Sequence, residues 1–548
     1  MKTDPRLTVH AAGDGITDDT SAISAAVQLA SSSGGGVVYL PTGNYKIITP
    51  SNATAGSPLV VPSRVILRGD SSTASLISVN DPNAAGETGG FWTWGGISFQ
   101  GSSLSGMTDL GVSFVNPSST PCATIWNLGS TGSSELFFNN LNVQMGNNRT
   151  FWFINVNELL VQGSDLSTGD AQNQTASQAG AVYLTGNSNV SVLNNTISYS
   201  FGRMHMENNT NVLIQGNTIT RNAENSDMEN GTAIESGGVE LSFSQNVQVL
   251  NNTVETLNAP TNELGDGEAI MAQNSGTGIQ DQGAVTSITS TTLTDTSALW
   301  GSTTSSAVAS GVVIVAMTSG AGVGEWRTVT GINTSTKTLT VSPAFSPVPS
   351  TGDLYSLTEW PIMNATIQGN TLTGNPNGII IYDGCYNCTI ESNTLTDSRD
   401  ILLRVDSVNS SYGESRGVHE VAITNSILKN TVTNMSGIRP AFIALDTEAF
   451  ASAGYSGMGE YDIQVGGNTI NPYAQNPSLS YNNPPTEIPQ DGIFPCFLYG
   501  PAPSQASGTT VFQNINFWAD SESAPVTYIP GFLPFTNQAC VTPSAPPN

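Results

Sequence analysis

Charged residues are scarce in this sequence, and positive charge is scarcest. Of 548 residues, 15 are Lys or Arg and 42 are Asp or Glu, which gives a formal net charge of −27. Nucleic acids and anionic membrane surfaces are bound through Lys and Arg side chains that neutralise phosphates. This balance therefore excludes nucleic acid and membrane surfaces as expected partners.

Long apolar runs are missing as well. No stretch reaches the roughly 18 apolar residues of a membrane-spanning helix, and the start MKTDPRLTVHAAGDG lacks the apolar region of a signal peptide. If the protein is exported, its signal peptide is not present in this chain.

Cysteine is equally rare, and five residues are too few for a disulfide scaffold of this length. Cys385 and Cys388 form a C-x-x-C inside a strand repeat, a context that disfavours redox chemistry and zinc binding. Cys496 and Cys540 flank the C-terminal segment and are candidates to tie it down, and Cys122 is expected to be a buried thiol.

A ten-residue pattern, an alternating apolar run followed by Asn-Thr, recurs along the chain. Two of the spacings are 22 and 23 residues and the others are longer, as if loops were inserted into a fixed unit; a period in the low twenties with strand and turn in each unit indicates a solenoid. Stacked coils place Asn above Asn, which favours a structural ladder over glycosylation at the N-x-T sequons. The Asn-Thr pairs begin at Asn195, Asn217, Asn252, Asn370, Asn393, Asn430 and Asn468.

The N-terminal stretch 13–47 predicts a short helix between turns and strands. Its polar start, Asp18, Asp19 and Thr20, has N-cap chemistry and precedes apolar residues at helical spacing, and the three glycines from Gly34 end the pattern. The strand VVYLP follows.

This stretch, together with the coil repeat over about 100–475, resembles right-handed parallel β-helix proteins of the pectin-lyase-like superfamily. In that superfamily a short helix caps the open end of the core. Its members include glycoside hydrolases, polysaccharide lyases and phage tailspikes, so the resemblance implies a secreted protein, extracellular or periplasmic, that acts on or binds a polysaccharide or oligosaccharide. For Asp14, Asp18 and Asp19, capping and turn roles are expected in place of catalysis.

The resulting fold prediction is all-β: a right-handed parallel β-helix with an N-terminal capping helix and a small inserted β-domain. Residues 1–50 form the capping segment, 51–284 and 359–475 form the β-helix, and 285–358 form the insert, where hairpin-like strands replace the Asn-Thr pattern. Residues 476–548 are expected to wrap or cap the helix.

Aligning the coils on their Asn residues indicates which side chains share a face. Counting back thirteen residues gives inward positions, and the residue after each is expected to point outward into a groove. The inward positions are Val182, Met204, Val239 and Ile380, and the outward ones are Tyr183, His205, Glu240 and Ile381. Charged residues concentrate on the outward face: Arg203, His205, Glu240, Asp266, Glu268 and Asp383, followed by Asp400, Arg404 and Asp406.

Paired carboxylates on neighbouring coils suit glycoside hydrolysis, in which one carboxyl group is the acid and the other the base or nucleophile. Glu240, Asp266 and Glu268 are therefore the candidate catalytic residues. The candidates for binding sugar hydroxyls are Arg203, His205, Asp383, Asp400 and Arg404. The net charge favours a neutral glycan. The resemblance implies an inverting mechanism, because several hydrolases of the superfamily invert.

The polygalacturonase motifs N-T-D, D-D, H-G and R-I-K are not present in that form, which places polygalacturonase activity in doubt.

Two alternatives to a glycoside hydrolase remain open: a polysaccharide lyase and a glycan-binding protein. A polysaccharide lyase would use Arg203, His205 or Arg404 near a uronate, with Ca²⁺ as an optional ligand and no cofactor otherwise required. A tailspike-like protein would bind glycan without consuming it, as a monomer or a homo-oligomer.

Overall fold

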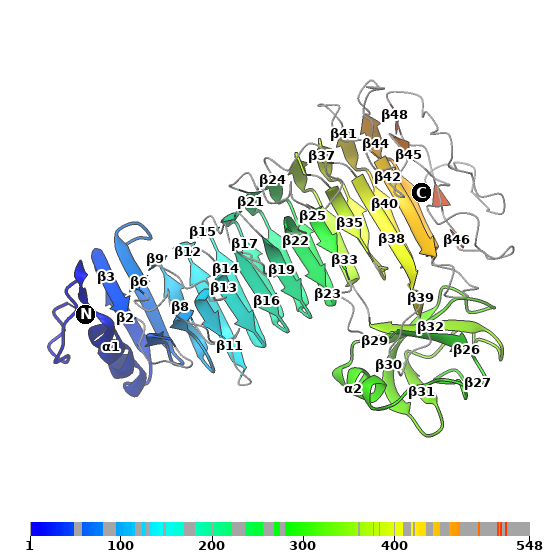
Figure 1. Cartoon of the computed structure of the whole chain (residues 1–548), viewed down its shortest axis with the longest axis horizontal. Helices are drawn as coiled ribbons and strands as arrows, with labels where there is room; N and C mark the ends of the chain where they lie inside the picture. Colours follow the sequence, from blue (N-terminus) through cyan, green and yellow to red (C-terminus); the bar gives the residue numbers. More distant parts are fainter. Residues whose placement is uncertain are drawn as a thin grey trace. The chain divides into compact units, whose positions relative to one another are not determined.

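The computed structural model shows a β-solenoid with an antiparallel insert (Figure 1). Contacts divide the chain into two compact units, each described separately below. The residues that the structure describes are 2–48, 57–80, 95–115, 123–127, 132–145, 149–168, 181–199, 202–221, 236–255, 268–273, 280–359, 362–375, 377–382, 384–398, 400–408, 418–419, 422–433, 442–449, 460–471, 492–493, 512–513, 516–517 and 521–522.

Helix α1 (Thr20–Ser32) lies at the N-terminal end, as the sequence predicts. Ile23 and Val27 of its apolar stripe are fully buried. The expected side-chain N-cap is wrong in detail, because Asp19 makes no cap bond and instead accepts hydrogen bonds from the backbone N–H groups of Ala12 and Gly13 at 2.7 and 3.0 Å. The carboxylate therefore fastens the preceding loop to the start of the helix.

Three parallel sheets form the coils of the first unit, and their strands follow one another from α1 toward the green strands of Figure 1. One sheet contains β1 (Asp14–Asp18), β3 (Gly43–Ile48), β6 (Ser75–Asn80), β9 (Gly111–Val115), β12 (Asn142–Met145), β15 (Asp165–Thr168), β18 (Thr196–Tyr199), β21 (Thr218–Arg221) and β24 (Thr253–Glu255). Another contains β2 (Gly36–Leu40), β5 (Val65–Gly69), β8 (Ser103–Thr108), β11 (Ser133–Asn139), β14 (Val156–Gln162), β17 (Ser188–Leu193), β20 (Thr210–Gln215) and β23 (Ser244–Leu250).

The remaining sheet carries the candidate site. Its strands are β4 (Leu59–Val60), β7 (Gly95–Ser98), β10 (Ala123–Asn127), β13 (Arg149–Ile154), β16 (Val182–Thr185), β19 (Gly202–Glu207), β22 (Ser236–Ser242) and β25 (Glu268–Ala272). Their inner side chains fill the solenoid, where Phe138 packs with Phe99, Phe151 and Phe153 at centroid distances of 5.1 Å.

The predicted asparagine ladder is present and buried. The side-chain carbonyl of Asn217 accepts from the backbone N–H and the amide of Asn195 at 2.9 and 3.0 Å, and Asn252 repeats the arrangement toward Asn217. Each rung also donates to a backbone carbonyl of a neighbouring coil, such as Asn217 to Val192 at 2.8 Å. The ladder therefore satisfies backbone groups at a turn that would otherwise be buried without partners.

The second unit contains further coils built in the same way. Their strands are β33 (Ile362–Gln368), β36 (Thr389–Glu391), β40 (Ala422–Leu428) and β43 (Glu460–Gly466); β34 (Thr371–Thr373), β37 (Thr394–Thr396), β41 (Thr431–Thr433) and β44 (Thr469–Asn471); and β35 (Asn377–Ile381), β38 (Asp400–Val408) and β42 (Phe442–Ala449). A second ladder runs through Asn370, Asn393, Asn430 and Asn468.

The inserted β-domain is an antiparallel seven-stranded sheet with its own apolar core. In sheet order its strands are β26 (Gln280–Ala284), β32 (Leu354–Glu359), β29 (Val313–Met317), β30 (Trp326–Asn333), β31 (Thr338–Ser342), β28 (Thr292–Thr294) and β27 (Ser287–Ile288), with helix α2 (Ser302–Ser310). Trp300 is buried in that core, and its indole N–H donates to Asp281 at 2.8 Å.

Cys385 and Cys388 are both buried and joined by a disulfide bond. The sequence expectation placed this pair inside the strand repeat but did not predict the bond. Cys122, Cys496 and Cys540 lie outside the described residues. Neither described helix is long and apolar enough to cross a membrane.

Candidate active site

Strand β19 supplies three polar side chains on one face of the site sheet. Arg203, His205 and Glu207 alternate with Met204 and Met206, and the two methionines are fully buried in the solenoid. Because side chains alternate along a strand, the packing of the methionines aims the three polar groups out of the core. The alignment of coils in the sequence predicted this direction for His205.

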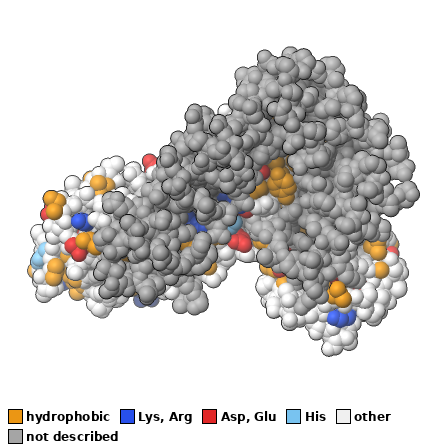
Figure 2. All heavy atoms as spheres, viewed as in Figure 1, with side chains coloured by type: hydrophobic (Ala, Val, Ile, Leu, Met, Phe, Trp, Pro, Cys, Tyr) orange, Lys and Arg blue, Asp and Glu red, His pale blue; other side chains and the backbone are white. Residues whose placement is uncertain are grey.

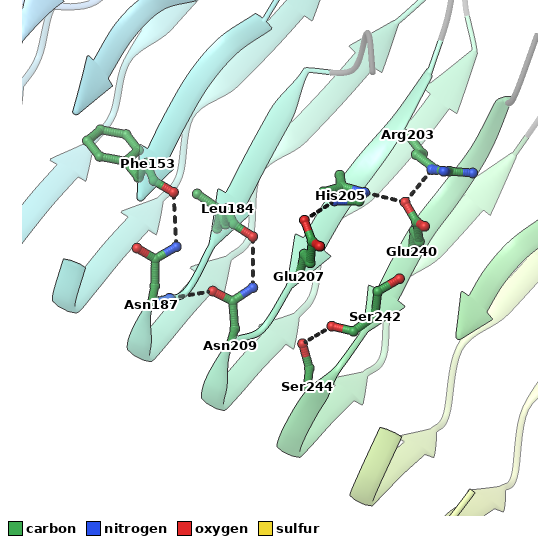
Figure 3. A network of polar contacts seen from close by, with 10 residues as sticks. All are labelled: Phe153, Leu184, Asn187, Arg203, His205, Glu207, Asn209, Glu240, Ser242 and Ser244. Atoms are coloured by element: carbon green, nitrogen blue, oxygen red, sulfur yellow. Dashed lines mark hydrogen bonds and ion pairs between the residues drawn. The ribbon is translucent and has the colours of Figure 1, made fainter. Parts of the chain in front are cut away.

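Glu240 on β22 joins the polar groups of β19 into one cluster (Figure 3). Its Oε2 atom contacts both Nε of Arg203 and Nδ1 of His205. The other ring nitrogen of His205 lies 3.3 Å from Oε2 of Glu207. The imidazole is thus held between two carboxylates, while one carboxylate is shared by two cationic side chains.

The cluster is largely shielded from solvent. Side-chain exposure is 1% for Glu240, 11% for Arg203, 14% for His205 and 25% for Glu207. Burial of an imidazole disfavours its charged form, but the hydrogen bonds to Glu207 and Glu240 outweigh burial and raise the pKa of His205 above 6.5. His205 is therefore held as a proton donor over a wider pH range than a free imidazole.

Three residues that the sequence did not single out as site residues extend the cluster along the sheet. Tyr183 is the register partner of His205, and the two rings stack at a centroid distance of 4.3 Å and an interplanar angle of 16°. The guanidinium carbon of Arg149 lies 3.9 Å from the centre of Tyr183 and 4.1 Å from that of Trp152. The coil alignment gave Tyr183 the same register as His205, whereas Arg149, at the start of β13, carries no such signal.

Glu268 begins β25, the next strand after β22 in the sheet, and its side chain is buried at 6% exposure. Glycines allow the close approach of these strands: a Cβ atom at Gly238 would collide with the carbonyl oxygen of Ala269, and one at Gly237 would come within 2.9 Å of that of Glu268. Glu240 and Glu268 therefore lie on adjacent strands, as predicted.

The structure describes the other predicted site residues only in part. Asp266 and Asp383 lie outside the described residues, and of Arg404 only the backbone, in β38, is described. Asp400 is fully buried in the second unit, where its carboxylate accepts a hydrogen bond from the backbone N–H of Gly378 at 3.1 Å. Ile381, predicted to point outward, is also fully buried, as every residue of β35 is buried.

Among the described residues, no group of three or more His, Cys, Asp and Glu is arranged to hold a metal ion. In Figure 2, the backbone and side chains that are neither hydrophobic nor charged make up much of the described surface, with charged side chains scattered among them. A cluster with Arg203, His205 and two carboxylates is therefore a local departure from the composition of the chain.

Two protein families match parts of the chain. Residues 7–89 match the family described as rhamnogalacturonase A/epimerase, pectate lyase-like, and residues 127–314 match the right-handed β-helix region. These matches, with three parallel sheets coiled as a solenoid, agree with the fold predicted from the sequence.

Curated relatives match over a short part of the chain. Alginate lyase 7 of Azotobacter vinelandii is 42% identical over 71 residues, which are 13% of this chain and 8% of that protein. Mannuronan C5-epimerase AlgE5 of the same organism is 39% identical over 71 residues, 13% of this chain and 7% of the relative. The chain thus matches less than a tenth of the length of either relative.

Among solved structures, the A-module of mannuronan C-5 epimerase AlgE6 from Azotobacter vinelandii covers 94% of this chain and 98% of its own, with 15% identity and a TM-score of 0.47.

Proposed function

Since this chain is a right-handed parallel β-helix protein of the pectate lyase-like superfamily, we propose that it is an enzyme acting on a polysaccharide, with its reaction at the Arg203, His205 and Glu240 cluster. The observation that carries the proposal is the imidazole of His205 held between Glu207 and Glu240, with Arg203 bound to the same Glu240. Acid–base catalysis requires side chains held in a fixed geometry, and these side chains hold one another in place on strands of the sheet.

The favoured chemistry is proton transfer at carbon 5 of a uronate sugar, which leads to elimination or epimerisation. Removal of that proton places negative charge on the uronate carboxylate, and fixed cations stabilise it. Arg203 and protonated His205 supply positive charge side by side, and Glu207, the most exposed carboxylate of the cluster, is the candidate base. The short matches to an alginate lyase and a mannuronan epimerase support this chemistry.

A glycoside hydrolase acting on a neutral glycan is the second candidate. Glu240 and Glu268 lie on adjacent strands, and neighbouring strands are about 4.8 Å apart. In that reaction Glu240, whose ionised form is stabilised by Arg203 and His205, would be the base or nucleophile, and the buried Glu268 the acid. Asp266 remains a predicted alternative to Glu268.

Incubation in deuterium oxide with uronate-containing and neutral glycans separates these reactions. Elimination produces ultraviolet-absorbing unsaturated ends. Epimerisation incorporates deuterium at carbon 5 without shortening the chain, and hydrolysis produces reducing ends with neither signal. Products from neutral glycans alone would reject the uronate proposal, and binding without any product would favour a tailspike-like role.

Every reaction is run with and without a chelator, because Ca²⁺ is the proposed optional ligand. A net charge of −27 repels a polyanion, and a hard cation that bridges carboxylates offsets that repulsion. Activity that is lost with chelator and restored by added Ca²⁺ supports a calcium-dependent enzyme; unchanged activity rejects that requirement.

A further inference from the structure

We propose that Arg149 and Tyr183 are positioning residues that fix the plane of the His205 imidazole through a continuous stack across three strands. Both residues act on the geometry of His205, the proton donor of the proposed function, on which this inference rests.

Tyr183 separates Arg149 from His205. The guanidinium carbon of Arg149 lies 3.9 Å from the centre of the Tyr183 ring, and the imidazole of His205 is stacked on that ring at 4.3 Å and 16°. Two planar groups at these distances cannot share one face of a phenol ring. Arg149 and His205 therefore occupy opposite faces of Tyr183.

Trp152 also contacts the guanidinium group of Arg149. The guanidinium carbon is 4.1 Å from the centre of the indole, and Trp152 meets Tyr183 edge-to-face at 5.7 Å and 72°. Trp152, Tyr183 and His205 occupy one register position on β13, β16 and β19. Trp152 and Arg149 are each 1% exposed, so this end of the stack is immobilised by packing.

The stack continues into the ion pairs of the cluster. One face of the His205 imidazole is covered by Tyr183, while its two ring nitrogens are held by Glu240 and Glu207. Ring plane and ring edge are thus fixed by different neighbours. Stacking on Tyr183 limits tilting of the imidazole plane. The two hydrogen bonds, which lie in the plane of the imidazole, limit that tilting less strongly.

Arg149 also acts electrostatically. The groups that face His205 are Tyr183 from β16, Glu240 from β22, and Arg203 and Glu207 from its own strand, with Arg149 beyond Tyr183. Burial chiefly raises the pKa of Tyr183, Glu207 raises it further, and the positive charge of Arg149 opposes that rise. The positive charge of Arg149 likewise opposes protonation of His205.

The test uses three variants of the whole chain labelled with ¹³C-histidine. The sequence contains three histidines, so His205→Gln identifies the His205 signal. In Arg149→Met, the His205 ring proton should lose part of the ring-current shift caused by Tyr183. The pKa of His205 should rise by several tenths of a unit, because a unit charge at a distance on the order of 8 Å is removed. Arg149→Lys keeps the charge and loses the planar stack, so it should change the ring-current shift while leaving the pKa nearer the native value.

Tyr183→Leu provides the second line of evidence if the Arg149 variants do not fold. It removes the stacking partner directly and should produce the largest change in ring-current shift. A His205 signal with native shift and native pKa in the folded variants would overturn the proposal. These readouts do not depend on catalysis, so a native protein that is inactive on every glycan would reject the proposed function while leaving this inference to be decided by the spectra.

Discussion

At the scale of single residues, Glu240 is the side chain on which most of the candidate site depends. Its carboxylate contacts Arg203 and His205 at 1% exposure. Breaking a buried ion pair by removing one partner leaves the other charge without compensation and costs about 3–5 kcal/mol. The consequences of replacing this residue therefore extend to stability as well as chemistry.

Glu240→Gln keeps the shape of the side chain and removes its charge. We expect the pKa of His205 to fall, because one of its two carboxylate partners is lost, and we expect product formation to drop by about 10²-fold or more. Histidine NMR titration and initial rates measure the two effects. Glu391→Gln is the matched control, since Glu391 forms an ion pair with Lys429 at 2.8 Å; equal losses in both variants would contradict the assignment.

The raised pKa of His205 predicts a pH-dependent contribution to stability. The folded-state pKa lies above the reference value of 6.5, so the contribution is fully present below that value and is lost as pH rises through the folded pKa. The difference in unfolding free energy between the native protein and His205→Gln should therefore shrink with rising pH in that window. Denaturant unfolding at a series of pH values measures it, and a difference independent of pH would show that His205 is not coupled to its glutamates.

At the scale of structural elements, the turns of each coil depend on buried amide ladders. The exposed residues Asn189, Asn211 and Asn246 form a parallel ladder on the surface, linked at 2.9 and 3.0 Å. Water can replace hydrogen bonds on the surface but not those of the buried ladder. The two ladders should thus differ strongly in their contribution to stability.

Asn217→Ala should destabilise the protein by roughly 2–4 kcal/mol, because it leaves several buried donors and acceptors around Asn195, Asn252 and Val192 without partners. The control is Asn211→Gly, in which glycine tolerates the φ of 57° at this exposed rung; its cost should stay below about 1 kcal/mol. Unfolding monitored by circular dichroism compares them, and similar losses would show that burial of the ladder is not decisive.

At the scale of the whole molecule, the insert is attached to the coils of the second unit by apolar packing. Ile314 and Ala316 of β29 pack with Met363, Tyr386 and Ile423. The insert therefore has a core of its own and a second apolar face that the coils cover.

Trp326→Ala should loosen this attachment, because Trp326 packs against that second face and meets the ring of Tyr386 at 5.6 Å. We expect a loss of about 1–3 kcal/mol and faster hydrogen exchange in both β29 and the coil around Tyr386. Val348→Ala, at an exposed position of the insert, serves as the control. Exchange that increases in the insert alone would show that the two parts are not energetically coupled.

Local sequence patterns determined much of the fold. The helix at 20–32 follows from apolar residues at helical spacing, and the coils follow from alternation and recurring asparagines, because these features act between neighbours in the chain or between equivalent positions of successive coils. The same alignment gave the direction of His205 and the adjacency of Glu240 and Glu268.

Only the tertiary structure decided which of these polar residues interact. The contact of Glu240 with both Arg203 and His205, the stack of Arg149, Tyr183 and His205, and the disulfide of Cys385 and Cys388 all depend on side-chain rotamers and strand spacing. Asp400 looked like its neighbours in the sequence pattern but is fully buried. A coil repeat specifies the register and the face of a side chain, whereas burial and pairing depend on what the other coils place around it.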